Sequence, residues 1–148
     1  MGFRRGGVIA VLVVLALALT GCSDTAANEE SGASDLATVE PIAGSDVARV
    51  TLSEDAARRL DITTAPITEL GGRTARTAIP YAAVLYDPNG DTWAYTNPEP
   101  LVFIRSPIRV VTIEGNTAVL SAGPPAGTRV VTVGAAELLG TEYEVGEE

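Results

Sequence analysis

Short apolar runs alternate with clusters of Gly, Pro, Asn and Asp between Val47 and Leu139. The runs are rich in Val, Ile, Thr and Tyr, which is typical of β-strands that end at turns. The pattern predicts a mainly β fold, a small β-barrel or β-roll, and Gly and Pro within 123–127 predict a rigid loop. The expected strands are 47–52, 62–70, 73–79, 81–86, 92–96, 101–105, 108–113, 118–121 and 129–133.

Two short stretches depart from the strand pattern. Residues 54–60 follow Ser53, a good N-cap, and carry two acidic residues in the first turn and two arginines near the end. We therefore expect one short α-helix there, in which the arginines serve the helix dipole. Residues 135–139 are long enough for one turn of helix, and an acidic tail is expected over 141–148.

The first 21 residues have the three parts of a secretory signal peptide. Arg4 and Arg5 precede an apolar run at 8–19, and small residues follow it. As a helix, the 12 residues of that run would span about 18 Å, well short of the ~30 Å hydrocarbon core of a bilayer. The pattern therefore favours a cleaved signal peptide over a permanent transmembrane anchor.

The signal ends in Leu19-Thr20-Gly21-Cys22, and Cys22 is the only cysteine in the chain. This motif resembles the lipobox of bacterial lipoproteins. The resemblance implies that Cys22 receives a diacylglycerol and palmitate-type acyl chains and becomes the mature N-terminus. Two or more acyl chains anchor a protein stably. The alternative is a generic cleavage site followed by an unrelated cysteine.

Residues 22–46 are predicted to be a lipidated cysteine followed by a flexible acidic linker. The segment is rich in Ser, Ala, Gly and acidic residues and has no aromatic residue. The alternative is a segment that folds when it meets a partner. The expected organisation is therefore a signal peptide at 1–21, this linker, and a single β-domain at 47–148.

The charge of the chain excludes nucleic acid as a partner. Removal of the signal leaves eight arginines against nineteen acidic residues, a net charge of −11, and the chain has no Lys and no His. Such a chain repels nucleic-acid phosphates and anionic lipid headgroups alike. Attachment to the membrane is therefore expected through the lipid, on the extracytoplasmic side of the cell membrane.

The residue types that most metal sites and catalytic centres need are scarce. Zinc, copper and iron sites use His, Cys or Met clusters, and a histidine triad needs His. Asp87, Asn89 and Asp91 match the opening of a calcium-binding EF-hand loop, but Thr92 and Pro98 stand where that loop needs Gly and Glu. We therefore interpret this segment as a hairpin turn, and we expect no metal, no cofactor and no enzymatic activity.

Several short motifs follow one another in a fixed order along the chain. They are Ile79-Pro80, Ala83-Val84, Asn89-Gly90-Asp91, Thr92-Trp93-Ala94-Tyr95, Gly115-Asn116, Val119-Leu120, Pro125 to Val131, and Gly134-Ala135. Their order resembles the membrane-proximal β-domain of periplasmic adaptor proteins, also called membrane-fusion proteins, which serve efflux transporters. An upstream segment at 50–67 is similar to a part that precedes the rest of an adaptor.

The resemblance implies a β-domain that contacts the extracytoplasmic face of an inner-membrane transporter of the ABC or RND type. An ordinary adaptor also has a lipoyl-like domain and usually a long helical hairpin. About a dozen residues separate Ile67 from Ile79, too few for either element. The chain therefore resembles an adaptor reduced to its membrane-proximal part. Adaptors often form rings, so a homo-oligomer is left open.

Two functions follow from these observations. The leading hypothesis is a lipid-anchored, non-enzymatic accessory protein of a transporter, with Arg105 and Arg109 as partner contacts; the alternative for both is a surface arginine that balances nearby acids. The rival is a lipoprotein that binds a small ligand or the cell wall through Trp93 and Tyr95. Core packing across strands is the commoner use of such aromatic residues.

Overall fold

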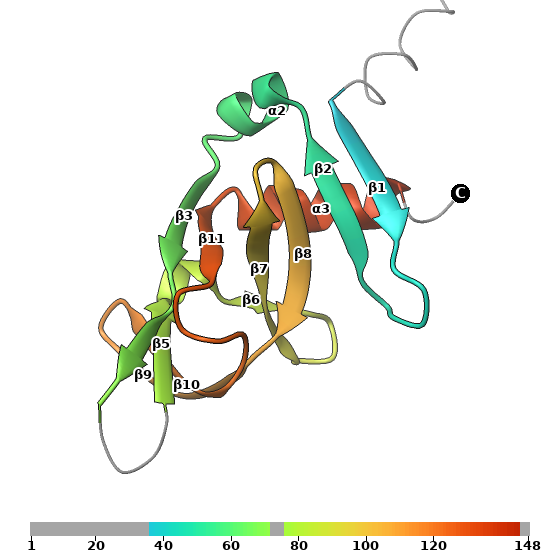
Figure 1. Ribbon diagram of the computed structural model, residues 1–148. Helices are drawn as coiled ribbons and strands as arrows, with labels where there is room; N and C mark the ends of the chain where they lie inside the picture. Colours follow the sequence, from blue (N-terminus) through green and yellow to red (C-terminus); the bar gives the residue numbers. More distant parts are fainter. Residues whose placement is uncertain (1–35, 72–75, 146–148) are drawn as a thin grey trace, which may run out of the picture.

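The computed structural model describes residues 36–71 and 76–145, which form two β-sheets and two α-helices (Figure 1). The α-helices are α2 (Glu54–Arg59) and α3 (Ala135–Val145), and a 3-10 helix covers Tyr81–Ala83. The larger sheet contains β1 (Ala37–Pro41), β2 (Ala48–Leu52), β3 (Thr63–Pro66), β6 (Leu85–Tyr86), β7 (Thr92–Glu99), β8 (Val102–Pro107) and β11 (Arg129–Val133). The smaller contains β4 (Thr68–Leu70), β5 (Arg76–Pro80), β9 (Arg109–Glu114) and β10 (Thr117–Ala122).

Both sheets are antiparallel and open. The larger sheet runs in the order β1-β2-β8-β7-β11-β3, with β6 paired to β7, and the smaller runs β4-β5-β10-β9. The predicted mainly β class is confirmed, while neither sheet of the described residues closes into a barrel. Edge strands therefore remain in both sheets, and they matter for what the domain can bind.

Two segments pass from one sheet to the other at a buried isoleucine. Ile67 joins β3 to β4 and is 2% exposed, while Ile108 joins β8 to β9 and is 7% exposed. Each apolar side chain fills the space between the sheets where its strand changes sheet. A core forms around them from Ile67, Ile79, Ala83, Ala94, Ile108, Ala118, Leu120 and Val130.

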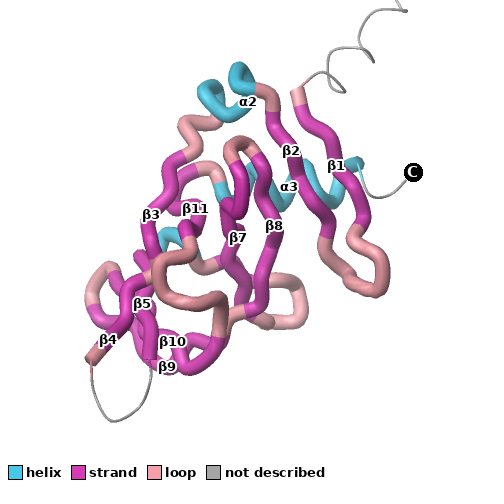
Figure 2. The backbone as a smooth tube through the Cα atoms, viewed as in Figure 1, coloured by secondary structure: helices cyan, strands magenta, loops and turns pink. Residues whose placement is uncertain are grey.

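A second core lies between the larger sheet and the two helices, on the face that α3 crosses in Figure 2. Its members are Val50, Leu52, Ala56, Tyr95, Phe103, Val131, Ala135 and Leu138. Burying one large apolar side chain stabilises a fold by about 1.5–3 kcal/mol. Both cores are small, so each large member is a substantial part of the stability of the domain.

The folded domain begins earlier than the sequence predicts. Residues 37–41, expected to belong to a flexible linker, form β1, which pairs with β2 in a register that places Val39 opposite Val50. The partly buried Leu36 and Val39 pack on the helix-side core, and this long-range contact outweighs the polar composition of the segment. The predicted signal peptide at 1–21, Cys22 and the predicted linker up to residue 35 lie outside the described residues.

The C-terminal helix is longer than predicted. One turn was expected over 135–139 and an acidic tail after it, but α3 runs for 11 residues to Val145. The helix is held by burial of Leu138 and Glu142, which lie four residues apart and so share one face. No helix within the two described ranges is long and apolar enough to cross a membrane.

The predicted local elements are largely correct. Ser53 caps α2, since its Oγ accepts a hydrogen bond from the Ala56 amide at 3.1 Å. Asp87 accepts hydrogen bonds from the amides of Asn89 and Asp91, both at 2.9 Å, which confirms the hairpin turn between β6 and β7. The strand expected over 81–86 is wrong in its first half, where the 3-10 helix lies.

The turn between β11 and α3 depends on Gly134. Its φ is +85°, and an added Cβ would clash with the Ile62 side chain and lie 3.2 Å from the Leu60 carbonyl oxygen. We expect Gly134→Ala to lower the free energy of unfolding by about 1–3 kcal/mol, because a left-handed backbone strains any residue with a side chain. Urea denaturation of the purified domain measures this change.

Gly140→Ala is the matched control. Gly140 lies inside α3 with no atom within 4 Å of an added Cβ, so the substitution should raise stability by about 0.5–1 kcal/mol through helix propensity. Equal effects of the two substitutions would contradict the assigned role of Gly134.

Candidate functional site

Arg105 lies inside the domain. It stands on β8 opposite Tyr95 of β7, and the residue is only 5% exposed. Its Nε donates to Glu142 Oε2 at 3.2 Å and its Nη2 to Glu142 Oε1 at 3.1 Å. The guanidinium and the carboxylate therefore form a buried, two-pronged ion pair that joins β8 to α3.

Glu142 is the centre of a wider network. Its carboxylate also accepts hydrogen bonds from the Ala48 amide at 3.1 Å and from the Tyr95 hydroxyl. Arg105 Nη2 in turn donates to the Asp46 carbonyl at 3.0 Å. The network therefore ties α3, β7 and β8 to the start of β2, and no buried side-chain polar atom of the described residues lacks a partner.

Two aromatic rings flank the buried guanidinium. Arg105 Cζ lies 4.5 Å from the ring centroid of Trp93 and 5.5 Å from that of Tyr143. These distances allow cation–π attraction between the guanidinium and each ring. Tyr95 has no exposed surface, so the expected Trp93 and Tyr95 binding surface does not form. Both aromatic residues belong mainly to the cluster around Arg105.

Burial and charge set the protonation states in this cluster. Burial, with help from the Glu142 carboxylate, raises the pKa of Tyr95 far above its ordinary value. Burial acts to lower the pKa of Arg105, but the hydrogen bonds and charge of Glu142 outweigh it and raise that pKa. Near neutral pH the hydroxyl stays protonated and the guanidinium stays charged. Neither group exchanges a proton there, so the cluster acts as a structural device.

The carboxylate of Asp87 stabilises the β6–β7 turn, and its pKa is shifted as well. Desolvation acts to raise the pKa of its carboxyl, but hydrogen bonds from the Asp91 amide and the Trp93 indole outweigh it, with help from Asn89 and Gly90. The pKa of Asp87 is therefore lowered. This carboxylate is occupied by the backbone of its own turn, as the hairpin interpretation requires.

Glu142 is the member of the cluster that the sequence prediction missed. The sequence pattern places Glu142 in a solvated acidic tail, whereas in the structure the residue is only 5% exposed. Ala135, Leu138 and Glu142 follow the spacing of one helix face, and this spacing was the available signal. This spacing is easily overlooked, because a glutamate such as Glu142 normally indicates a helix face that is exposed to solvent.

Arg109, the other arginine predicted to contact a partner, lies on the surface at the start of β9. It lines an open hollow of about 520 Å³ together with Pro107, Ile108 and Pro124. Among the described residues, Arg109 takes part in no salt bridge. The two arginines predicted together are therefore separated by the fold: Arg105 is buried and paired, and Arg109 is exposed.

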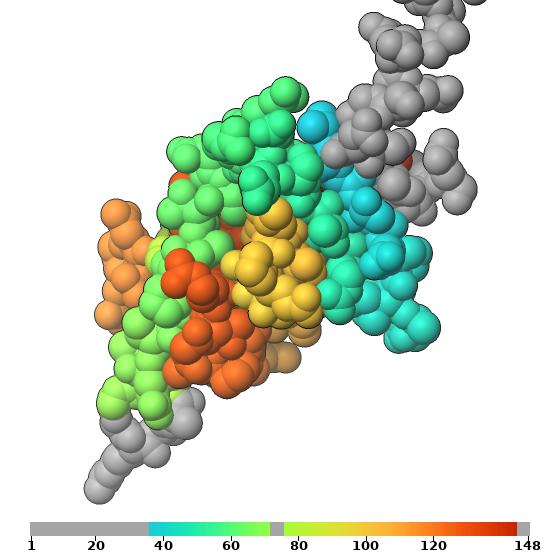
Figure 3. Space-filling model, turned by 45° about the horizontal axis from the view of Figure 1, so that its top comes forward, coloured from blue at the N-terminus to red at the C-terminus, as the bar shows by residue number. Residues whose placement is uncertain are grey.

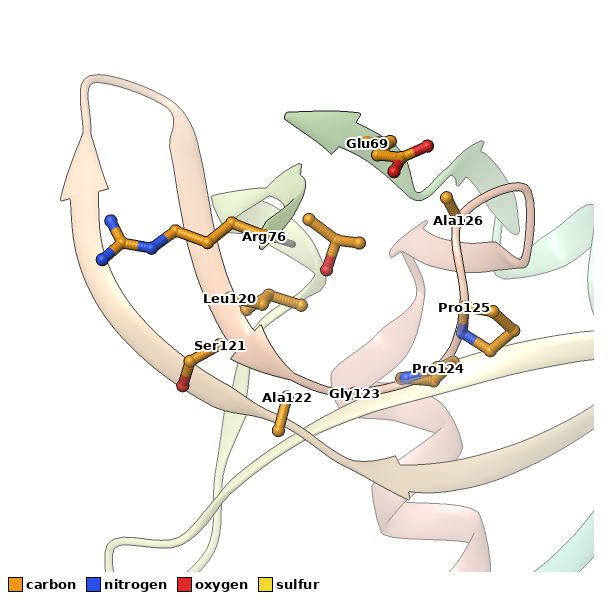
Figure 4. A pocket seen from close by; sticks show the side chains of 10 residues that line it. Glu69, Arg76, Leu120, Ser121, Ala122, Gly123, Pro124, Pro125 and Ala126 are labelled. Atoms are coloured by element: carbon orange, nitrogen blue, oxygen red, sulfur yellow. The ribbon is translucent and has the colours of Figure 1, made fainter. Parts of the chain in front are cut away.

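A second hollow adjoins the first across the loop after β10. It measures about 440 Å³, and Figure 4 shows Pro124 and Pro125 along one side of it and Arg76 on the opposite side. In the space-filling view this loop, coloured orange-red, stands exposed beside the yellow β8 (Figure 3). We call residues 122–125 with Arg76 and Arg109 the Gly-Pro-Pro surface.

The Gly-Pro-Pro surface is held rigidly against the core. Gly123 has a φ of +156°, and an added Cβ would lie 3.1 Å from Ile108 Cγ2. The two prolines that follow fix their own φ angles. A hydrogen bond from the Thr128 amide to the Pro125 carbonyl closes the loop at 3.2 Å. The surface therefore presents a preformed shape to a partner.

Metal binding finds no support in the described part of the chain, where no group of three or more His, Cys, Asp or Glu side chains is arranged to hold an ion. Comparisons with protein-family models, with curated proteins and with solved structures each gave no match. The function therefore has to be argued from the surface of this domain and from its N-terminal sequence.

The buried ion pair predicts that a conservative substitution of Glu142 strongly lowers the stability of the domain. Glu142→Gln keeps the shape of the side chain but leaves the Arg105 guanidinium buried without a countercharge. We expect the free energy of unfolding to fall by about 3–5 kcal/mol, as for other broken buried pairs. Chemical denaturation followed by Trp93 fluorescence gives the value.

The matched control is Glu144→Gln on the exposed side of the same helix, which should change stability by less than about 0.5 kcal/mol. The double variant Arg105→Met/Glu142→Leu removes both charges and should recover much of the lost stability. A Glu142→Gln protein as stable as its control would show that the pair contributes nothing.

The raised pKa of Tyr95 predicts a loss of stability at alkaline pH. In the unfolded chain a tyrosine ionises near pH 10, whereas Tyr95 in the folded domain keeps its proton. Above about pH 10 the unfolded state therefore binds fewer protons, and stability falls by up to about 1.4 kcal/mol per pH unit. Denaturation midpoints between pH 8 and about pH 11 should show a shallower decline for Tyr95→Phe. An unchanged slope would contradict the prediction.

Proposed function

We propose that this chain is a lipid-anchored, non-enzymatic accessory protein that binds the extracytoplasmic face of a membrane transporter through its Gly-Pro-Pro surface. The observation that carries the proposal is the rigid loop with an exposed arginine, Arg76 or Arg109, beside each adjoining hollow. Both arginines lack a salt-bridge partner among the described residues. Glu69 also lines the hollow beside Arg76, so the cationic character of this surface is clearest at Arg109. An exposed arginine beside a rigid loop of an acidic protein is suited to an acidic group on a partner surface.

The shape of this surface favours a macromolecule over a small ligand. Small-molecule sites are concave and bury most of the surface of their ligand. The two hollows here are open to solvent and lie on either side of a projecting loop. A protein partner could fill both at once and contact the loop between them. The rival cell-wall hypothesis relied on Trp93 and Tyr95, and it loses support because Tyr95 is buried.

With a lipid on Cys22, weak contacts at the Gly-Pro-Pro surface would be sufficient to bind the transporter. A lipid anchor confines the domain to the membrane that holds the transporter, which raises the effective concentration of one near the other. Contacts too weak to hold two soluble proteins together can then keep a complex assembled. The mechanism we propose is therefore tethering combined with a modest, preformed contact surface.

Photocrosslinking in intact cells tests the proposal. A photoreactive residue at Arg109 should form an adduct with a permease subunit, identified by mass spectrometry. The matched control is Arg59, an exposed arginine on α2, which lies far from the Gly-Pro-Pro surface in Figure 1. Adducts only to cell-wall material, or the same products from Arg59, would move the assignment to the rival function.

A second experiment tests the lipid anchor separately from the Gly-Pro-Pro surface. Cys22→Ser should release the protein from the membrane fraction and strongly lower the yield of the Arg109 adduct, because the effective concentration falls by orders of magnitude. Membrane retention of a Cys22→Ser protein from which residues 1–21 have been cleaved, as verified by mass spectrometry, would contradict lipidation at Cys22. The assignment of the contact surface would then rest on the crosslinks alone.

A further inference from the structure

β9 is an edge strand with exposed apolar side chains. It pairs with β10 on one side and has no strand on the other within the described sheet. Val111 is 48% exposed and Ile113 is 43% exposed. An edge strand offers unpaired backbone N–H and C=O groups, so it can pair with another extended segment. The exposed valine and isoleucine add apolar surface to that edge.

The other described edges differ from β9. β4 at the opposite edge of the smaller sheet has only three residues. β1 and β3, at the two ends of the larger sheet, carry none of the large exposed apolar side chains of the described residues. β6, which pairs only with β7, carries the exposed Tyr86 but has only two residues. Native proteins normally keep edges short, polar or charged. β9 is therefore the edge at which an additional strand is best accommodated.

The shape of β9 argues against a second copy of this chain as the occupant. The β9–β10 register shifts twice, between Val119 and Leu120 and between Leu120 and Ala122. Such bulges bend an edge, so two identical folded edges, neither of which can adjust, pair poorly over their length, whereas a short flexible segment can follow the bend. Two copies would also bring together two chains with a net charge of −9 or more negative. A short segment of a different protein avoids both costs.

The charges at the ends of β9 indicate the chemistry of that segment. Arg109 at the start and Glu114 at the end are both exposed and have no salt-bridge partner among the described residues. An apolar segment with an acidic end at Arg109 and a basic end at Glu114 would complement the strand. Arg109 also lines the hollow beside Pro124, so the acidic end would enter the Gly-Pro-Pro surface.

We propose that β9 is a docking strand for an extended segment of the partner, paired antiparallel to β9, basic at its N-terminal end, apolar in its middle and acidic at its C-terminal end. The antiparallel direction follows from the slightly better pairing of antiparallel ladders. The inference rests on the proposed function only for the identity of the partner as a transporter. The chemistry of the segment rests on β9 itself.

Synthetic peptides test the docking strand directly. The probe is a fluorescein-labelled peptide, Lys-Lys-Val-Thr-Val-Thr-Val-Asp-Asp, titrated with detergent-solubilised full-length protein and followed by fluorescence anisotropy. We expect it to bind roughly threefold to tenfold more tightly than the same peptide with its charged ends exchanged. A version N-methylated at alternate amides should not bind, because it cannot complete the ladder. Equal binding of all three peptides would overturn the inference.

A charge exchange in the protein supplies the matched variant. Arg109→Glu/Glu114→Arg changes only exposed side chains, so it should fold normally and prefer the peptide with exchanged ends. Arg59→Glu on α2 should keep the original preference. Thermal melts of each variant verify folding. Concentration-dependent dimerisation that the charge exchange abolishes would instead identify a second copy as the occupant and overturn the proposal.

The outcomes distinguish this inference from the proposed function. A permease adduct at Arg109 with no peptide binding would leave the accessory function standing and reject the docking strand. Peptide binding with the expected charge preference, but without a permease adduct, would keep the docking strand and reject the transporter as its partner.

Discussion

The ion pair between Arg105 and Glu142 is the interaction on which the rest of the domain depends. It joins residues 37 positions apart in the chain, and both side chains are almost completely buried. A buried charge is costly unless it is paired and fully hydrogen-bonded, and here Tyr95, the Ala48 amide and the Asp46 carbonyl complete the shell. One network thereby holds α3, the centre of the larger sheet and the β1–β2 hairpin in place.

This interior network leaves a different part of the domain free for binding. The two sheets meet around Ile67 and Ile108, where strands pass from one sheet to the other, so the smaller sheet projects from the helix-covered part of the fold. Its edge strand β9 and the loop at Gly123 lie next to each other, because Arg109 and Gly123 line the same hollow. The buried ion-pair network and the surface proposed to meet a partner are thus distinct parts of the domain, and Ile108 lies between the two sheets beside that surface.

Arg105 and Arg109 show why the candidate site could be predicted only in part. Both are arginines on neighbouring strands around Pro107, and their local sequence does not distinguish them. The distinction comes from α3, which places Glu142 against Arg105, whereas Arg109 forms no salt bridge with any of the described residues. An arginine is buried where the tertiary fold supplies a carboxylate and aromatic rings, and it stays on the surface where the fold supplies neither.

The sequence by itself determined the mainly β class, α2 with its Ser53 cap, the Asp87 turn and most strand positions, because these depend on local propensity and turn chemistry. It also carries a motif at 19–22 that resembles a lipobox, and lipidation of Cys22 stays a prediction. Only the tertiary structure decided that residues 37–41 form a strand, that α3 continues to Val145 and that Glu142 is buried. These segments are short or polar, and their stability comes from partners that lie far away in the chain.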